Sequence, residues 1–251
     1  MEMHLLELLL LADACRRAGA AHLTAVVPYF GYARQDRRAS GREAVGARLI
    51  ADLLQAAGLQ HLLAVDLHTA ALEGVFAIPL EHLSAVPFLV QAVRPWVAAN
   101  AVIVAPDLGA VKLAERYASF LQRPLAIVHK TRVSGEDVRA QAIMGEVRGL
   151  APLVVDDMIS TGGTVEAAVR ALLAAGCVPE VGVVTSHALL VGSAVERLRA
   201  LPLRWLVATD SVARPAGVPL PLRVTGLRPL LAEAIQRLHR CQSLDELIIH
   251  V

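Results

Sequence analysis

The stretch from Leu153 to Thr164 constrains the fold of this chain more than any other part of the sequence. Three apolar residues, Leu153–Val155, predict a buried strand that runs into two carboxylates, Asp156 and Asp157. A small turn follows, which we call the glycine turn and which consists of Ser160, Thr161, Gly162, Gly163 and Thr164. The residues after it predict a helix. A strand, a turn and a helix in this order place free backbone N–H groups at the positive end of the helix dipole, which predicts a phosphate-binding site.

The two carboxylates before the glycine turn cannot bind phosphate themselves. They are suited to sugar hydroxyls, or to a metal ion that the phosphates share. Phosphate donors beside hydroxyl acceptors indicate a sugar phosphate. A strand–glycine–helix turn is also common in α/β folds that bind nothing there, so the prediction depends on the rest of the chain.

Strands and helices alternate along the remaining chain, which predicts α/β structure with mostly parallel sheets. The 251 residues are 55% hydrophobic, enough for one large or two modest domains. The strands that we expect are rich in Val, Leu and Ile and lie at 22–28, 61–65, 101–105, 124–128, 180–187 and 205–211.

Composition excludes several classes of protein. The formal net charge is +1 and only 4% of residues are aromatic, which argues against a nucleic-acid-binding face. The sequence contains no uninterrupted run of about 18 apolar residues, so we expect no membrane span. The N-terminal stretch contains Glu2, Glu7 and Asp13 and predicts a buried helix rather than a signal peptide. Three cysteines without metal or disulfide spacing predict reduced thiols in the cytoplasm.

Four further stretches are candidates for a site. The segment Tyr29–Arg38 mixes aromatic rings with arginines, and predicts either a solvated basic loop or a nucleotide site. His68 follows a predicted strand together with Asp66, where α/β proteins build their sites. Asp107 lies at another strand-to-helix corner, where a helix N-cap is the alternative. The charged segment His129–Asp137 predicts a loop, or a solvated hairpin tip.

Taken together, five stretches resemble one family, ribose-phosphate diphosphokinase, also called phosphoribosyl pyrophosphate synthetase. In chain order they are Pro28–Arg37, Val65–His68, Pro106–Gly109, Lys130–Arg132 and Val155–Thr164. Phosphoribosyltransferases share only the last stretch and are a poorer match. The resemblance implies two Rossmann-like domains of the type I phosphoribosyltransferase kind, with residues 1–84 on the ATP side and residues 85–251 carrying the ribose 5-phosphate loop.

The resemblance also implies a reaction and the residues that perform it. The diphosphoryl group of ATP would move to the C1 hydroxyl of ribose 5-phosphate, giving phosphoribosyl pyrophosphate and AMP for nucleotide biosynthesis. The implied roles are ATP binding by Arg34, Gln35 and His68; magnesium binding by His68 and Asp107; catalysis by Lys130 and Arg132; and ribose 5-phosphate binding by Asp156, Asp157, Ser160, Thr161, Gly162, Gly163 and Thr164.

Two departures from the family pattern accompany the match. Family members carry strands and a Phe-x-Asp-Gly-Glu motif before the helix that matches 5–17, so we expect a first domain truncated at its N-terminus. Many members also have aspartate where this chain has Ser160. The alternatives are a non-catalytic regulatory paralogue and, less favoured, a phosphoribosyltransferase. The family pattern also implies a cytoplasmic homo-oligomer, from dimer to hexamer.

Overall fold

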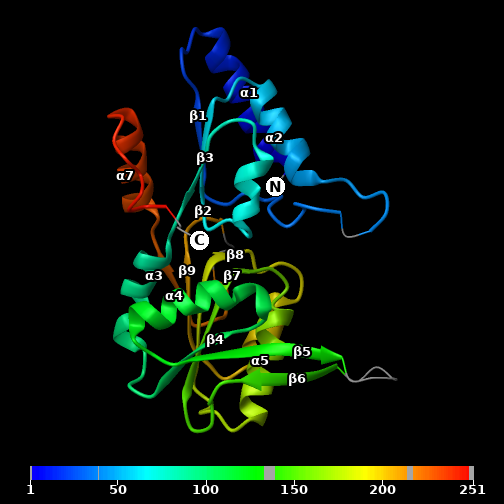
Figure 1. Cartoon of the computed structure of the whole chain (residues 1–251), viewed down its shortest axis with the longest axis vertical. Coiled ribbons are helices and arrows are strands. Elements are labelled where there is room, and N and C mark those ends of the chain that lie inside the picture. The colour runs from blue at the N-terminus through cyan, green and yellow to red at the C-terminus, as the bar shows by residue number, and fades with distance from the viewer. Residues whose placement is uncertain (1, 39, 133–138, 214–216, 249–251) are drawn as a thin grey trace. The chain divides into compact units, whose positions relative to one another are not determined.

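The chain forms two compact α/β units, each built on its own sheet (Figure 1). The computed structural model describes residues 2–38, 40–132, 139–213 and 217–248. The first unit comprises Met1–Ser84 with Arg228–Val251, and the second comprises Ala85–Leu227. The expectation of α/β structure with mostly parallel sheets is confirmed.

The sheet of the first unit has three parallel strands in the order β1-β2-β3. They are β1 (Thr24–Val27), β2 (His61–Val65) and β3 (Leu80–Leu83). The helices of this unit are α1 (Glu2–Arg17), α2 (Gly46–Ala56), η1 (Ala70–Val75) and α7 (Arg228–His239). The central strand is buried on both faces, because four of its residues, Leu62–Val65, have no solvent exposure. This explains why its sequence is a continuous apolar run rather than an alternating one.

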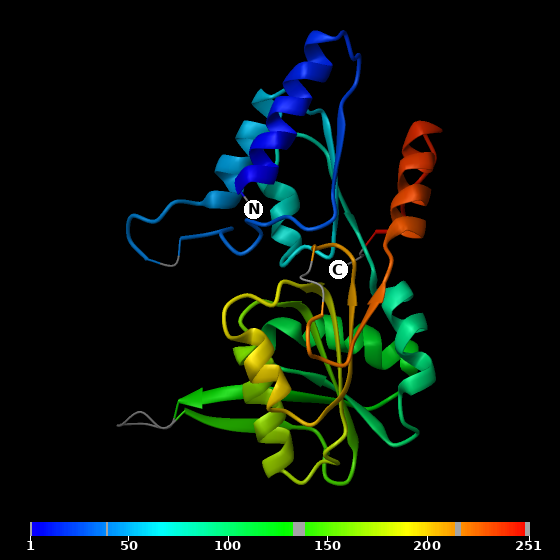
Figure 2. The same cartoon turned by 180° about the vertical axis from the view of Figure 1, so that it is seen from behind.

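Helices α1 and α2 cover one face of this sheet, and α7 lies on the other side (Figures 1 and 2). The core on the α1–α2 side joins Ala12 of α1 and Leu54 of α2 to Leu62 and Ala64 of β2. Residues at i, i+3 and i+4 along α2 face this core, as expected for an amphipathic helix.

The C-terminal segment differs from the sequence-based division, which placed residues 85–251 together. In the structure, Arg228–Val251 groups with the first unit. The Ser84 N–H donates to the Leu247 carbonyl at 2.8 Å, and Leu83 forms an isolated bridge with Ile248. The sequence could not indicate this, because the pairing joins segments more than 160 residues apart.

The sheet of the second unit has seven strands in the order β10-β9-β8-β7-β4-β5-β6. All neighbours are parallel except β5 and β6. The strands are β4 (Ala101–Ala105), β5 (Leu125–Arg132), β6 (Arg139–Met144), β7 (Ala151–Ile159), β8 (Val181–Ala188), β9 (Leu203–Thr209) and β10 (Leu222–Thr225). Strands β4, β7 and β8 are almost wholly buried, which fits a sheet covered on both faces.

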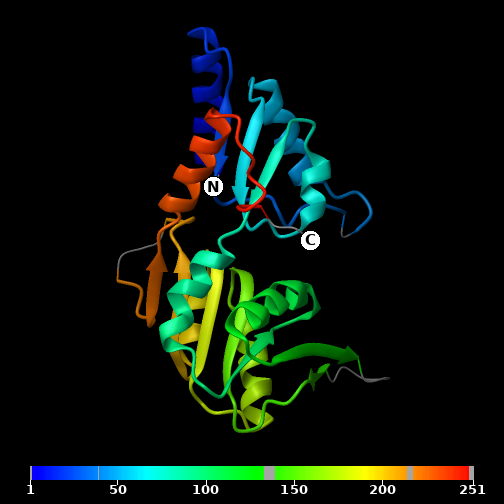
Figure 3. The same cartoon turned by 60° about the vertical axis from the view of Figure 1, so that its left-hand side comes forward.

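Helices cover both faces of the second sheet, with α3 and α4 on one side and α5 on the other (Figures 1 and 3). They are α3 (Val86–Val93), η2 (Arg94–Trp96), η3 (Leu108–Ala110), α4 (Val111–Leu121), α5 (Gly163–Ala174) and α6 (Ala194–Arg199). The core on the α5 side joins Val165 and Leu172 to Val102 and Val154. Helix α6 contributes Leu198 to the same core.

Two strands are longer than the sequence indicated. The predicted strand at Leu153–Val155 continues to Ile159, because Asp156 pairs with Thr185 and Ile159 with Ala188 of β8. Strand β5 likewise continues through Arg132, pairing antiparallel with Arg139 of β6, so the predicted loop does not begin at His129. Residues 133–137 of that loop lie outside the described residues. None of the helices in the described part of the chain has the length and apolarity that a membrane crossing requires.

Candidate active site

The second unit has a topological switch point between β4 and β7. The chain passes from β4 to β5 on one side of β4, and later returns to place β7 on the other side. Connections that leave a parallel sheet in opposite directions open a crevice at the carboxyl ends of the two strands, and ligands of open α/β sheets bind there. Asp107 follows β4, and the glycine turn follows β7.

The glycine turn joins β7 to α5. Gly162 is the N-cap of α5 and has φ +76°, a left-handed conformation that side chains other than glycine rarely adopt. Helix α5 begins at Gly163, earlier than the sequence pattern indicated, so Thr164 lies in its first turn. The first N–H groups of an α-helix have no partner within the helix. The turn therefore presents backbone donors at the positive end of a twelve-residue helix, as a phosphate requires.

Asp156 and Asp157 lie on β7 and not on a loop. Both are half-buried. Asp156 Oδ1 accepts a hydrogen bond from the Asp157 N–H at 3.0 Å. Burial, followed by the nearby carboxylates of Asp157 and Asp107, raises the pKa of Asp156 well above its usual value. The structure thus brings three predicted site residues together at one sheet edge.

Asp107 has the helix-capping geometry that the sequence left open as an alternative. It is the N-cap of η3, and its Oδ1 accepts from the N–H groups of Gly109 at 2.9 Å and Ala110 at 3.2 Å. The cap fixes the carboxylate beside β7. A capping role and a place in the site are therefore compatible for this residue.

The carboxylate cluster of Asp107, Asp156 and Asp157 supplies the oxygen donors that magnesium prefers. Burial, and after it the repulsion among these carboxylates, raises the pKa of Asp156, and a divalent cation would offset the repulsion. Among the described residues, however, no three His, Cys, Asp or Glu side chains are arranged to hold a metal ion by themselves. A magnesium ion at this position would need substrate oxygens and water for its remaining ligands.

In the first unit, Arg34 and Gln35 lie on the turn that follows β1. Both side chains are exposed. The turn is anchored by Phe30, which is buried and packs edge-on against Phe76 with ring centroids 5.4 Å apart. The Ala47 N–H donates to the Gln35 carbonyl at 3.1 Å, which ties the turn to the start of α2. Phe30 therefore holds the turn, and Arg34 and Gln35 face solvent.

His68 lies after β2 and is exposed, whereas Asp66 is buried and has φ +40°. The Asp66 N–H still donates to the Leu83 carbonyl of β3 at 2.9 Å, and the positive φ of Asp66 turns the backbone after this bond. Asp66 is therefore part of the buried framework of the loop, and His68 is on its exposed side.

Sequence reasoning missed His82, which supports this loop. His82 is buried, and its Nε2 accepts a hydrogen bond from the Leu67 N–H at 2.7 Å. Its Nδ1 lies 3.3 Å from Glu73 Oε1. Accepting through Nε2 leaves the ring proton on Nδ1, which faces the carboxylate. No sequence motif includes His82, so only a predicted strand at residues 80–83 could have indicated that this side chain is buried beside the loop.

Lys130 and Arg132, the predicted catalytic residues, lie on the final part of β5. Their side chains belong to the part of the chain that is not described. The backbone register places Lys130 opposite Gln141 and Arg132 opposite Arg139.

Comparisons with known proteins give one consistent result. Residues 1–58 match the family model for the N-terminal domain of ribose phosphate pyrophosphokinase, and residues 94–219 match the phosphoribosyl transferase domain. The chain is 41% identical over 245 residues to a ribose-phosphate pyrophosphokinase from Gloeobacter violaceus, covering 97% of this chain and 74% of the relative. It is 42% identical to one from Rhodopirellula baltica, covering 97% and 78%.

A solved structure agrees with the sequence matches. The crystal structure of phosphoribosylpyrophosphate synthetase from Mycobacterium smegmatis aligns with a TM-score of 0.86 and 36% identity, over 94% of this chain and 78% of the other. The alignment spans both units, and the matches cover 74–78% of the length of these relatives rather than one shared domain. The chain belongs to the ribose-phosphate pyrophosphokinase family.

Proposed function

We propose that this chain transfers the diphosphoryl group of ATP to the C1 hydroxyl of ribose 5-phosphate, giving phosphoribosyl pyrophosphate and AMP. In this reaction a bond forms between the C1 oxygen and the β-phosphorus of ATP, and the bond from that phosphorus to the α-phosphate oxygen breaks. AMP leaves with the electron pair, and the hydroxyl proton is released. The observation that carries the proposal is the glycine turn beside the carboxylate cluster at the switch point, in a chain of this family.

Ribose 5-phosphate fits the geometry of the second unit. The N–H groups at the start of α5 would donate to the 5-phosphate, with the hydroxyls of Ser160, Thr161 and Thr164 beside them. Asp156 and Asp157 would accept hydrogen bonds from the ribose hydroxyls. Two fixed acceptors and a fixed phosphate site would hold the sugar in one orientation, and positioning of this kind is a large part of phosphoryl-transfer catalysis.

The ATP side is assigned by family resemblance to Arg34, Gln35 and His68, with Lys130 and Arg132 as the cations that act on the reacting phosphates. Phosphoryl transfer needs neutralisation of charge more than covalent help. Magnesium, when bound, would supply part of that charge, and Asp107 and His68 would help to hold the Mg–ATP complex. An imidazole is a weaker ligand for magnesium than a carboxylate, so His68 is better suited to the phosphates of that complex.

Assembly and location are also proposals. We propose that the chain forms a homo-oligomer, between a dimer and a hexamer, which light scattering would measure. We place it in the cytoplasm, where nucleotide precursors are made and where the free cysteines Cys15, Cys177 and Cys241 would remain reduced.

The activity is tested by incubating the chain with ATP, ribose 5-phosphate and magnesium and measuring AMP. AMP should form only when ribose 5-phosphate is present. The matched control is Asp157→Asn, which should reduce AMP formation strongly. The proposal is contradicted if the folded wild-type chain forms no AMP, or if it instead consumes phosphoribosyl pyrophosphate and a nucleobase with release of pyrophosphate.

A further inference from the structure

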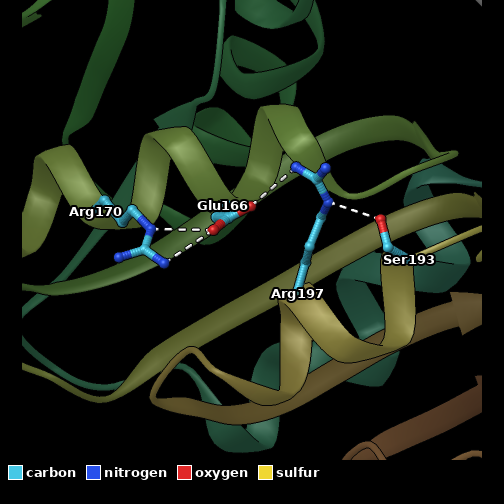
Figure 4. Close-up of polar contacts among 4 residues, drawn as sticks. All are labelled: Glu166, Arg170, Ser193 and Arg197. Carbon is cyan, nitrogen blue, oxygen red and sulfur yellow. Dashed lines mark hydrogen bonds and ion pairs between the residues drawn. The ribbon is translucent and has the colours of Figure 1, made fainter.

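The first turn of α5 contains a carboxylate that does not belong to the carboxylate cluster. Glu166 lies three residues after the start of the helix, and two arginines contact it (Figure 4). Arg170 donates to Glu166 Oε1 through Nε at 3.1 Å and through Nη2 at 2.9 Å. Arg197, 31 residues away in sequence, donates through Nη1 to Oε2 at 3.2 Å. These two guanidinium groups lower the pKa of Glu166, Arg170 most strongly, so it is ionised at neutral pH.

Arg197 reaches Glu166 from α6, which packs against the glycine turn. A Cβ atom added to Gly162 would lie 3.6 Å from Cα of Ala194, at the start of α6. A Cβ added to Gly163 would lie 3.6 Å from Nη1 of Arg197. The Arg197 Nε donates to Ser193 Oγ at 2.9 Å, which fixes the direction of the side chain. The guanidinium group is therefore held beside the backbone of the glycine turn.

The two arginines have different surroundings. Arg170 follows Glu166 by one helical turn, on the side away from the glycine turn. Its single positive charge is enough to neutralise the Glu166 carboxylate without Arg197. Arg197 lies on the side of the glycine turn and brings a second positive charge there. Two arginines and one glutamate leave a net charge of +1. A negative charge so close to a phosphate site would oppose binding, and a positive charge would favour it.

We propose that Arg197 sets the affinity of the glycine turn for the phosphate group of ribose 5-phosphate, and that Glu166 moderates its positive charge. Arg197 is here a positioning residue that acts through its field. This inference rests on the proposed function, because it names a residue that tunes the same phosphate site. It predicts that removal of the positive charge weakens binding and that removal of the negative charge strengthens it.

The variants Arg197→Gln and Glu166→Gln separate this role from a structural one. Both keep a side chain that can hydrogen-bond, so both preserve the link between α5 and α6 to a similar degree. The dissociation constant for ribose 5-phosphate, measured by calorimetry without ATP, should rise roughly three- to tenfold in Arg197→Gln, as expected for one partly exposed charge. In Glu166→Gln it should fall by a smaller factor. A purely structural link would shift both variants in the same direction.

Two further variants serve as controls. Arg197→Lys keeps the charge without the planar fork of donors, so it should stay close to wild type. Arg199→Gln removes the same charge from the same helix and should leave the affinity unchanged, which controls for the net charge of the protein. The rise in Arg197→Gln should also shrink at high salt, because exposed charges are screened. The KM for ATP should change little in all four variants.

Each result is decisive. If Arg197→Gln binds like wild type, if Arg197→Lys is as weak as Arg197→Gln, or if Glu166→Gln also binds more weakly, the inference is overturned while the proposed function stands. If the folded wild-type chain binds neither ribose 5-phosphate nor inorganic phosphate, the proposed function fails and the inference fails with it. Opposite shifts in the two Gln variants, with Arg199→Gln unchanged, support it.

Discussion

The glycine turn of the second unit and the Arg34–Gln35 turn of the first unit are built in different ways. The glycine turn lies between a nine-residue strand and a twelve-residue helix, and α6 packs against it. Asp156 and Asp157 are part of a strand that pairs with β4 as far as Val154 and with β8 as far as Ile159. Arg34 and Gln35 are exposed on a turn whose buried anchor is Phe30.

This difference indicates how each substrate is bound. The backbone of the proposed phosphate site in the second unit is held between a strand of the sheet and a helix, so phosphate binding should order little. If the exposed Arg34 and Gln35 bind the nucleotide as proposed, binding must order their side chains, which costs side-chain entropy. Substitutions near the glycine turn should therefore change both stability and binding, and substitutions near Gln35 should change binding with little effect on stability.

The largest effect is expected for Asp157→Asn. It exchanges a charged acceptor for an amide at the proposed ribose hydroxyl site, which should cost about 2 kcal/mol of transition-state binding. That corresponds to a loss of roughly thirtyfold in kcat/KM for ribose 5-phosphate. Steady-state kinetics would measure it, with Glu180→Gln on the surface of the same unit as the control. An unchanged kcat/KM in Asp157→Asn would remove Asp157 from the site.

The second-largest effect is expected for Gly162→Ala. The added Cβ meets no atom closer than 3.6 Å, so the cost is backbone strain at φ +76°. Left-handed backbone costs a residue with a side chain about 1–2 kcal/mol, which thermal unfolding would detect. The affinity for ribose 5-phosphate should also fall, because the first N–H groups of α5 would shift. Gly149→Ala is the matched control, because Gly149 also has a positive φ and open space around it but lies outside the proposed site. It should lower stability without changing the affinity for ribose 5-phosphate.

Asp156→Asn should make the chain more stable at neutral pH. The raised pKa means that folded Asp156 holds its proton more tightly than unfolded Asp156 does. The wild-type chain therefore loses stability as the pH rises above the usual aspartate value and this carboxyl ionises in the fold. Asp156→Asn removes that loss. In denaturant unfolding, the free energy of unfolding of the variant minus that of the wild type should therefore increase from about pH 4 to neutrality. A constant difference across this range would contradict the raised pKa.

The smallest effect on stability is expected for Gly46→Ala, at the start of α2. A Cβ there would collide with Oε1 of Gln35, the far end of a flexible side chain that can move aside, and would lie 3.0 Å from Cδ1 of the Tyr32 ring, which must shift by a few tenths of an ångström. Stability should change by less than about 1 kcal/mol, while the KM for ATP rises because Gln35 is displaced. Gly41→Ala, with open space around it, is the control. If Gly46→Ala leaves the KM for ATP unchanged, Gln35 does not contact the nucleotide.

The sequence predicted the local features well. The α/β class, the turn after β7 and the positions of Asp66 and Asp107 after strand ends follow from patterns within about twelve residues. The length of β7 could not be predicted, because the local pattern ends the strand before Asp156 and Asp157, and only their pairing with β8 extends it. Contacts between distant segments were also hidden: Arg197 with Glu166, His82 with Leu67, and residues 247–248 with the end of β3.

The most direct measurement follows the phosphorus atoms of ATP through the reaction. ATP labelled at the γ-phosphate is incubated with the wild-type chain, magnesium and ribose 5-phosphate, and the products are separated. If the diphosphoryl group moves whole, the label appears in phosphoribosyl pyrophosphate and the released nucleotide is AMP. Label in a ribose bisphosphate with release of ADP, or label in inorganic phosphate alone, would contradict diphosphoryl transfer by this chain.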